Sequence, residues 1–344
     1  GRKRRINQST CNKDYSCVKG FCPSFVTVEG GQLKKPKKDK KGDLSALPNI
    51  PEPVLPVADV AWGIVVAGVG GTGVITIGSL LGMAAHLEGK GVITQDAAGL
   101  AQKGGATWSH IQIANRPDAI YTTKVDTAKA DLVIGCDAIV AANKATLAVL
   151  QPGRTFVALN THRTPTASFV NNPNWQFPDA HCDTAITSAL GEGSVGSFDA
   201  EQVATQLLGD SIYTNPLLLG YAWQKGRVPL TLASLMRAME LNGVQVENNK
   251  AAFEWGRRCA HDLPAVQALF QAAQVIQFVK KPALADMIAK RVDFLTGYQN
   301  AAYAADYQAF VQKVQAAEAK LGTTTRLSEV VARYLFKLMA YKDE

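Results

Sequence analysis

Apolar and polar positions alternate along residues 59–200 in a way that predicts strands separated by helices. The run Trp62–Ala67 is continuously apolar, as expected of a strand that is buried on both faces of a sheet. Val74–Leu87 then repeats apolar residues at helical spacing. The pattern predicts further strands over Gly91–Thr94, Trp108–Ala114, Asp131–Gly135 and Thr155–Leu159, and a helix over Ala138–Leu150. This order predicts an α/β fold, a doubly wound and mostly parallel sheet of Rossmann-like type.

The rest of the chain divides into segments of different composition. Residues 1–31 are rich in Cys, and residues 32–58 hold six Lys and five Pro without an apolar period, which is typical of a linker. Residues 201–344 are predicted to be helical almost throughout. Their expected helices run from Asp262 to Lys280, from Leu284 to Leu321 (one helix, or two broken near Gly297) and from Leu327 to Tyr341. We therefore predict four segments: 1–31, 32–58, 59–200 and 201–344.

Charge is distributed unevenly along the 344 residues. The formal net charge is +7, but residues 1–43 alone carry 12 Lys and Arg against 4 Asp and Glu. A basic stripe on a folded face would indicate nucleic-acid binding, whereas Lys residues in a linker indicate a solvated spacer. We therefore expect no nucleic-acid partner. No run of about 18 apolar residues is present, so we expect no membrane span. No apolar stretch follows the basic residues 2–5, so we expect no secretory signal and a cytoplasmic protein.

Three cysteines near the start are candidate metal ligands. Cys11, Cys17 and Cys22 lie within twelve residues in the pattern C-x5-C-x4-C-P. Thiolates are soft ligands suited to iron, and a Cys followed by Pro closes the bacterial ferredoxin motif, so iron–sulfur ligation is favoured. A zinc site, although the usual C-x2-C pair is absent, and inert thiols are the alternatives. Three thiolates fall short of the four that a cubane takes, so a further ligand is expected upstream of Gly1.

A glycine-rich loop follows the first predicted strand. Gly68, Gly70 and Gly73 form G-x-G-x-x-G, and Gly71 adds further backbone freedom. Bare N–H groups and a helix N-terminus favour an anion at such a loop. Asp96 follows the second strand, where an NAD site places its ribose-binding carboxylate. The loop is interpreted either as the dinucleotide site of an NAD-dependent dehydrogenase or as a tight turn only.

Other candidate site residues lie after the second predicted strand, on the third and after the fifth. Lys103, Gly104 and Gly105 are interpreted either as a loop that brings the lysine to a phosphate or carboxylate, or as a solvated turn. His110 on the third strand and His162 after the fifth are candidates for catalysis, with a structural histidine as the alternative in each case.

Three stretches together resemble a known family. Residues 11–30, which contain the three cysteines, resemble the end of the ferredoxin-like region in the long, fused indolepyruvate:ferredoxin oxidoreductases. The glycine loop through Gly89, followed by Gly99–Gly105, resembles the gamma-type domain of the 2-oxoacid:ferredoxin oxidoreductases. The stretches Asn215–Gly226, Glu240–Gly243 and Tyr334–Tyr341 resemble the helical tail of the fused enzymes. The chain is thus similar to the C-terminal part of such an enzyme, except at the linker.

The resemblance implies a function for the whole enzyme. Such an enzyme decarboxylates an aryl 2-oxoacid, for example indole-3-pyruvate, on thiamine diphosphate with Mg, passes electrons through iron–sulfur clusters to ferredoxin and transfers the acyl group to coenzyme A. The resemblance implies a 4Fe–4S cluster on Cys11, Cys17 and Cys22. It also implies a role near coenzyme A or a domain interface, rather than NAD binding, for the two glycine loops. Their residues are Gly68, Gly70, Gly71, Gly73, Lys103, Gly104 and Gly105.

One departure limits what this chain is expected to do. The Gly-Asp-Gly and Asn motif that binds thiamine diphosphate is absent from it. We therefore expect a C-terminal fragment that is inactive alone and depends on the missing N-terminal thiamine-binding domains of the same polypeptide. Ferredoxin is the expected electron acceptor and a homo-oligomer the expected assembly. No catalytic residue is identified, and a non-catalytic structural subunit is the other interpretation.

Overall fold

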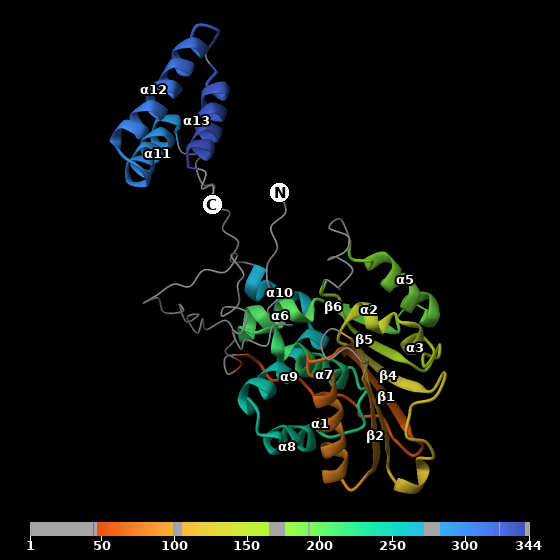
Figure 1. Cartoon of the computed structure of the whole chain (residues 1–344). Helices are drawn as coiled ribbons and strands as arrows, with labels where there is room; N and C mark the ends of the chain where they lie inside the picture. Colours follow the sequence, from red (N-terminus) through yellow and green to blue (C-terminus); the bar gives the residue numbers. More distant parts are fainter. Residues whose placement is uncertain are drawn as a thin grey trace. The chain divides into compact units, whose positions relative to one another are not determined.

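The chain forms two compact units, Gly1–Ala273 and Gln274–Glu344 (Figure 1). The computed structural model describes residue 44 and residues 47–98, 105–164, 176–191, 193–271, 283–322 and 324–340. The sequence pattern predicts a boundary between residues 200 and 201. In the structure the helices of residues 200–271 share the first unit with the sheet, because their apolar faces pack into the same core.

A six-stranded sheet forms the centre of the first unit, in the order β2-β3-β1-β4-β5-β6. The strands are β1 (Trp62–Val69), β2 (Gly91–Ala98), β3 (Ala106–Ala114), β4 (Ala130–Gly135), β5 (Phe156–Asn160) and β6 (Val195–Phe198). β1, β4, β5 and β6 are parallel neighbours, whereas β3 runs antiparallel to both β1 and β2. The predicted α/β fold with a mostly parallel sheet is confirmed, and β6 is a strand that the sequence pattern did not predict.

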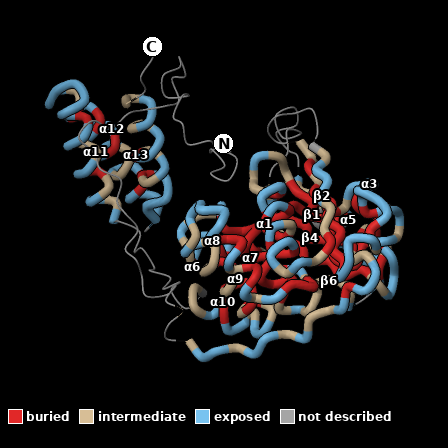
Figure 2. Tube along the Cα trace, turned by 90° about the horizontal axis from the view of Figure 1, so that it is seen from below, coloured by how far each residue is buried: buried red, intermediate tan, exposed pale blue. Residues whose placement is uncertain are grey.

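Helices cover both faces of the sheet (Figures 1 and 2). Ile64 and Val66 of β1 point into a large core with α1 (Val74–Leu87) and α7 (Thr214–Gln224). Val65, between them, points into a smaller core on the other face, beneath α2 (Ala138–Ala141), α3 (Lys144–Leu147) and α5 (Asp179–Leu190). The single helix predicted over residues 138–150 is wrong. It divides because the side chain of Asn143 accepts the N–H of Ala145 at 3.1 Å and starts α3.

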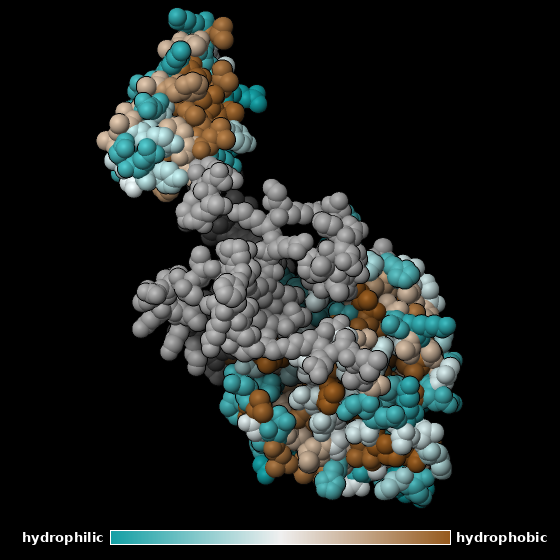
Figure 3. Space-filling view, in the orientation of Figure 1, coloured by the Kyte–Doolittle hydropathy of each residue, from teal (hydrophilic) through white to brown (hydrophobic). Residues whose placement is uncertain are grey.

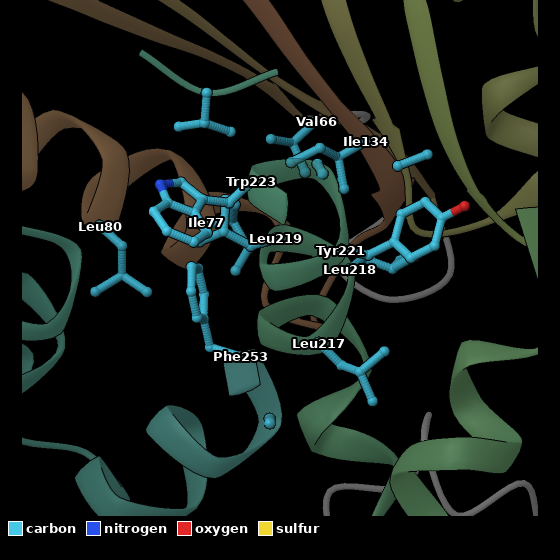
Figure 4. Packing of buried hydrophobic residues seen from close by; sticks show 14 of the residues in the cluster. Val66, Ile77, Leu80, Ile134, Leu217, Leu218, Leu219, Tyr221, Trp223 and Phe253 are labelled. Carbon is cyan, nitrogen blue, oxygen red and sulfur yellow. The ribbon is translucent and has the colours of Figure 1, made fainter. Parts of the chain in front are cut away.

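α7 is the central helix of the large core (Figure 4). The other helices around it are α6 (Ala200–Leu208), α8 (Leu232–Asn242), α9 (Val246–His261), α10 (Leu263–Gln271) and the 3-10 turn η5 (Ser211–Tyr213). Trp223 of α7 and Phe253 of α9 are fully buried, with ring centroids 5.7 Å apart. The backbones of α7 and α9 come very close at Gly220 and Gly256, where neither helix leaves room for a methyl group.

Part of the predicted linker packs along this core. The guanidinium of Arg257 donates to the carbonyl of Ile50 at 3.3 Å, and the amide of Gln224 donates to the carbonyl of Pro51 at 2.8 Å. Leu55 packs against the same core, half-buried. Residues 50–55 therefore lie beside α7 and α9, although their composition is that of a spacer.

The second unit is a bundle of α11 (Leu284–Tyr298), α12 (Ala301–Glu318) and α13 (Arg326–Met339). Its core contains Ile288, Leu295, Ala304, Tyr307, Val311 and Ala332. The hydroxyl of Tyr307 donates to the carbonyl of Ala332 at 2.9 Å and so fixes α13 against α12. The predicted break in the long helix is present just after α11. There Asn300 accepts the N–H of Tyr303 at 2.9 Å and starts α12.

Candidate functional site

The glycine loop connects the carboxyl end of β1 to α1, as predicted. A side chain at Gly68 has no room, because a methyl group there would lie 2.7 Å from Val74 Cγ2 and 2.9 Å from Cys136 Cβ. Gly71 and Gly73 have φ angles of 85° and 93°, in the left-handed region that L side chains rarely adopt. Glycines at these places therefore allow the turn that leads into α1.

The second glycine stretch meets the first. Gly70 donates its N–H to the carbonyl of Gly105 at 2.8 Å. The contact follows from the direction of β3, whose first residues lie at the same edge of the sheet as the last residues of β1. The two predicted loops are thus neighbours at Gly105. Lys103 and Gly104 lie outside the described residues.

A cavity of about 480 Å³ opens beside the glycine loop. It lies at the carboxyl ends of β1, β4 and β5. From β1 the chain continues to β2 and β3 on one side of the sheet and then to β4, β5 and β6 on the other. Ligand sites in open α/β sheets usually lie at such a switch point. The described lining of the cavity is rich in amides and hydroxyls and contains three carboxylates but no Lys or Arg. Its amide and carboxylate side chains belong to Asn160, Asn215, Asn242, Gln245, Asn249, Asp137, Glu201 and Asp210.

Asn215 connects the glycine loop to α7. Its side-chain amide donates to the carbonyl of Thr72 at 2.8 Å, and a methyl group at Gly73 would lie 3.7 Å from the same nitrogen. The Thr72 hydroxyl in turn donates to the carbonyl of Val69 at 2.7 Å. Because Asn215 is buried at the start of α7, the packing of that helix fixes the shape of the loop.

Burial controls the protonation of the groups where β4 reaches the cavity. It raises the pKa of the Cys136 thiol far above its ordinary value, and the nearby charge of Asp137 adds to the effect. Burial also raises the pKa of Asp137, although the N–H groups of Val140 and Ile139 partly oppose it. The Asp137 carboxylate starts α2 by accepting the Val140 N–H at 2.9 Å. The thiol is therefore a poor nucleophile, and the carboxylate has a structural role.

His162 lies between two carboxylates at the rim of this cavity. Its Nδ1 is 3.2 Å from Asp199 Oδ1, and its Nε2 is 3.4 Å from Glu201 Oε1. Burial raises the pKa of Asp199, but the hydrogen bonds from His162 and from the N–H of Gln202 outweigh it, and the net shift is downward. Asn160 holds the backbone here, since its Oδ1 accepts the Ala200 N–H at 3.0 Å. The predicted candidate His162 thus belongs to a charged cluster next to the cavity.

The other predicted histidine lies on the opposite face of the sheet. His110 of β3 is buried, and burial together with Lys124 lowers its pKa to about 4. It lines a second cavity of about 620 Å³ with Trp108 and residues 122–127. The two histidines therefore serve no common site.

The strand order differs from that of a dinucleotide site. Asp96 is exposed on β2, and β3 separates β2 from β1. Two strand spacings, roughly 10 Å, therefore lie between the glycine loop's strand and the strand of this carboxylate. This is not the geometry that the NAD hypothesis requires.

The described residues contain no group of three or more His, Cys, Asp or Glu placed to hold a metal ion. Cys136, Cys182 and Cys259 are buried and form no disulfide. Cys11, Cys17 and Cys22 lie outside the described residues, so their role as cluster ligands stays a prediction. Within the same described part of the chain, no helix has both the length and the apolar character needed to cross a membrane.

Most of the cavity's polar residues were not predicted from the sequence. Asn160 and Asp137 could have been found, because each follows a predicted strand at its carboxyl end. Asn215 lies 143 residues from the glycine loop that it contacts, and no local pattern predicts that contact.

Comparisons with known proteins find matches for both units of the chain. Residues 63–259 match the model described as Pyruvate ferredoxin/flavodoxin oxidoreductase, and residues 284–344 match a family of unknown function (DUF6537). The chain is 27% identical over 204 residues to indolepyruvate oxidoreductase subunit IorB of Pyrococcus horikoshii, over 59% of this chain and 97% of that protein. The corresponding subunit of Methanothermobacter thermautotrophicus is 30% identical over 183 residues, 53% of this chain and 87% of that protein. A solved pyruvate oxidoreductase subunit of Thermotoga maritima has a TM-score of 0.41 at 18% identity, covering 58% of this chain and 96% of that chain.

Proposed function

This chain belongs to the pyruvate ferredoxin/flavodoxin oxidoreductase family, and on that premise we propose that it is the gamma-type part of an indolepyruvate:ferredoxin oxidoreductase. The reaction of the whole enzyme would convert an aryl 2-oxoacid and coenzyme A, with two oxidised ferredoxins, into an acyl-CoA, CO2, a proton and two reduced ferredoxins. Its electron pair comes from the bond between the carbonyl carbon and the carboxylate. Family membership supports the reaction class, and the identities to IorB subunits support an aryl substrate.

We propose that this chain contributes a binding surface rather than the carbon chemistry. Thiamine diphosphate with Mg, held by other domains of the same polypeptide, would supply the electron sink for decarboxylation. Cys11, Cys17 and Cys22 would hold part of a 4Fe–4S cluster that relays electrons to ferredoxin. In this proposal residues 1–31 are the cluster segment and residues 32–58 the linker of a cytoplasmic homo-oligomer. The gamma-type domain predicted over residues 59–200 would include the helices of residues 200–271, which share its core, and the rest of the predicted helical region 201–344 would be the second unit.

The observation that carries the proposal is the amide-lined cavity beside the glycine loop. The described lining has three carboxylates and no cation, so it is unsuited to a diphosphate. Its amide and hydroxyl groups suit an uncharged chain that carries amides, such as the pantetheine arm of coenzyme A. The phosphates would lie outside, at the loop of Lys103, Gly104 and Gly105, next to Gly68, Gly70, Gly71 and Gly73.

The test uses the natural polypeptide that contains this chain, purified without oxygen. Ferredoxin reduction is expected to require both indole-3-pyruvate and coenzyme A. Asn215→Asp removes the amide donor to Thr72 and adds a negative charge, so it should raise the KM for coenzyme A with little change in that for the oxoacid. Asn143→Asp, which keeps its cap on α3, is the matched control. Reduction that needs no coenzyme A, or no reduction with any aryl 2-oxoacid, would refute the proposal.

A further inference from the structure

α13 of the second unit carries two apolar faces, and only one of them is buried. Successive helical residues are rotated by about 100°, so residues three and four apart share a face. The inward face consists of Ser328, Ala332, Leu335, Phe336 and Met339. The outward apolar face consists of Leu327, Val330, Tyr334 and Leu338, which are 51%, 52%, 54% and 75% exposed. We call these four residues the outer stripe.

Cations line one edge of the outer stripe. Arg326, Arg333 and Lys337 are exposed and fall between the stripe and the inward face on the helical wheel. The ammonium of Lys337 lies 5.3 Å from the ring centroid of Tyr334, so the basic edge and the stripe form one continuous surface. Figure 3 shows apolar residues gathered on this unit where α13 lies in Figure 1.

An outer stripe of this kind is unusual on a helix that is already packed. Each of the four side chains keeps half or more of its surface in water, although they stand in one row along the helix. Apolar rows of this spacing are a common means by which one helix binds another. Among the described residues of the second unit no helix covers the outer stripe, and the geometry points to a partner helix as its occupant.

We propose that the outer stripe docks an acidic amphipathic helix of another protein. The apolar row of that helix would cover Leu327, Val330, Tyr334 and Leu338, and its carboxylates would pair with Arg326, Arg333 and Lys337. Charge complementarity of this kind fixes orientation and rejects partners of the wrong sign. Glu329 is the only acidic residue of α13, and its carboxylate accepts a hydrogen bond from the Thr325 hydroxyl at 3.1 Å. Arg326, Arg333 and Lys337 outnumber it, so the edge has a net positive charge.

Three other occupants fit the surface less well. Two copies of α13 paired antiparallel would bring their identical basic edges together, and like charges would repel. A helix that lies on an anionic membrane keeps cations around its whole polar face, whereas here they line one edge only. Residues 1–43 of this chain carry 12 Lys and Arg against 4 Asp and Glu, so that segment has the wrong charge.

The test uses the full chain and two synthetic helical peptides of about four turns. Both peptides carry a Leu stripe, and one has Glu along the edge where the other has Lys. Fluorescence anisotropy should show that the Glu peptide binds and the Lys peptide does not. The double substitution Val330→Ala and Leu338→Ala should weaken the binding of the Glu peptide at least about tenfold. Arg333→Glu with Lys337→Glu should reverse the preference between the peptides. Phe310→Ala, at an exposed aromatic residue of α12, is the control and should change neither.

Four outcomes would overturn the proposal. They are equal binding of both peptides, binding of neither, self-association of the chain that Leu338→Ala abolishes, and binding to phosphatidylserine vesicles that the same change abolishes. Circular dichroism of each variant shows whether the bundle is still folded. The charge-reversed pair keeps the test valid even if the alanine pair destabilises α13, because its expected effect is a gain of binding to the Lys peptide.

Discussion

Replacing Gly256 with Ala should destabilise the first unit through one added methyl group. That methyl would lie 2.8 Å from both the carbonyl carbon of Leu217 and the backbone nitrogen of Tyr221, and closer still to the Leu217 oxygen. All three atoms belong to the backbone of α7, so no side-chain rotation can relieve the overlap. α7 and α9 must therefore move apart, in a core that contains Trp223.

The size of the effect follows from two opposing contributions. Overpacking in a core costs about 1–3 kcal/mol, and a rigid backbone obstacle places this site at the upper end. Ala has a better helix propensity than Gly, which stabilises α9 by about 1 kcal/mol. We expect a net loss of about 2 kcal/mol, which lowers the Tm of a domain of this size by about 4–8 °C. Urea denaturation followed by tryptophan fluorescence, to which the buried Trp223 and Trp255 contribute, measures this loss of stability.

Gly82→Ala in α1 is the matched control for this change. A methyl group there would meet only the side-chain methyl of Thr94, at 3.2 Å, and Thr94 is exposed and free to adjust. This variant should be as stable as the parent or more stable by up to about 1 kcal/mol. If Gly256→Ala were no less stable than Gly82→Ala, the inferred close approach of α7 and α9 would be wrong.

Three further predictions concern charge and protonation. Arg154→Ala should cost about 2 kcal/mol in urea denaturation, because the buried carboxylate of Asp131 loses two hydrogen bonds of 2.8 and 2.9 Å. The hydrogen bond from Ser328 lowers the pKa of Glu318 below 4.5, so its contribution to stability is present above that pH and is lost as the pH falls through the lowered pKa. Thermal unfolding of the second unit should show this loss of stability at low pH. Glu318→Gln should remove the part of the pH dependence that comes from Glu318. Burial raises the pKa of Cys259 to about 12, so mass spectrometry should find this thiol unmodified by iodoacetamide at neutral pH until urea unfolds the chain.

Local pattern was sufficient for long, strongly patterned elements such as β1 and α1, whereas the single helix predicted over residues 138–150 was wrong. The apolar run that became β1 and the helical period that became α1 reflect burial on two faces and on one face, which a sequence displays directly. β6 was not predicted because it is only four residues long, Val195–Phe198, and includes a Gly and a Ser. The direction of β3 was equally inaccessible, because the same residues alternate in the same way whichever way a strand runs.

The candidate site was predicted only where the chain itself brings its parts together. The glycine loop is continuous in sequence, so its position between β1 and α1 followed from the motif. Its contact with Gly105 depends on an antiparallel strand, and its contact with Asn215 depends on the packing of α7. Both contacts join residues that are far apart in the sequence, so no local sequence pattern predicts them.

The antiparallel strand makes the glycine loop depend on the register of its neighbour. β3 pairs with β2 so that Thr107 lies opposite Ala98, and with β1 so that Ala106 lies opposite Val69. The carbonyl of Gly105, which accepts the N–H of Gly70 at 2.8 Å, directly precedes that last pair. A shift of β3 by one residue would therefore turn its side chains to the opposite faces of the sheet and move this acceptor away from the loop.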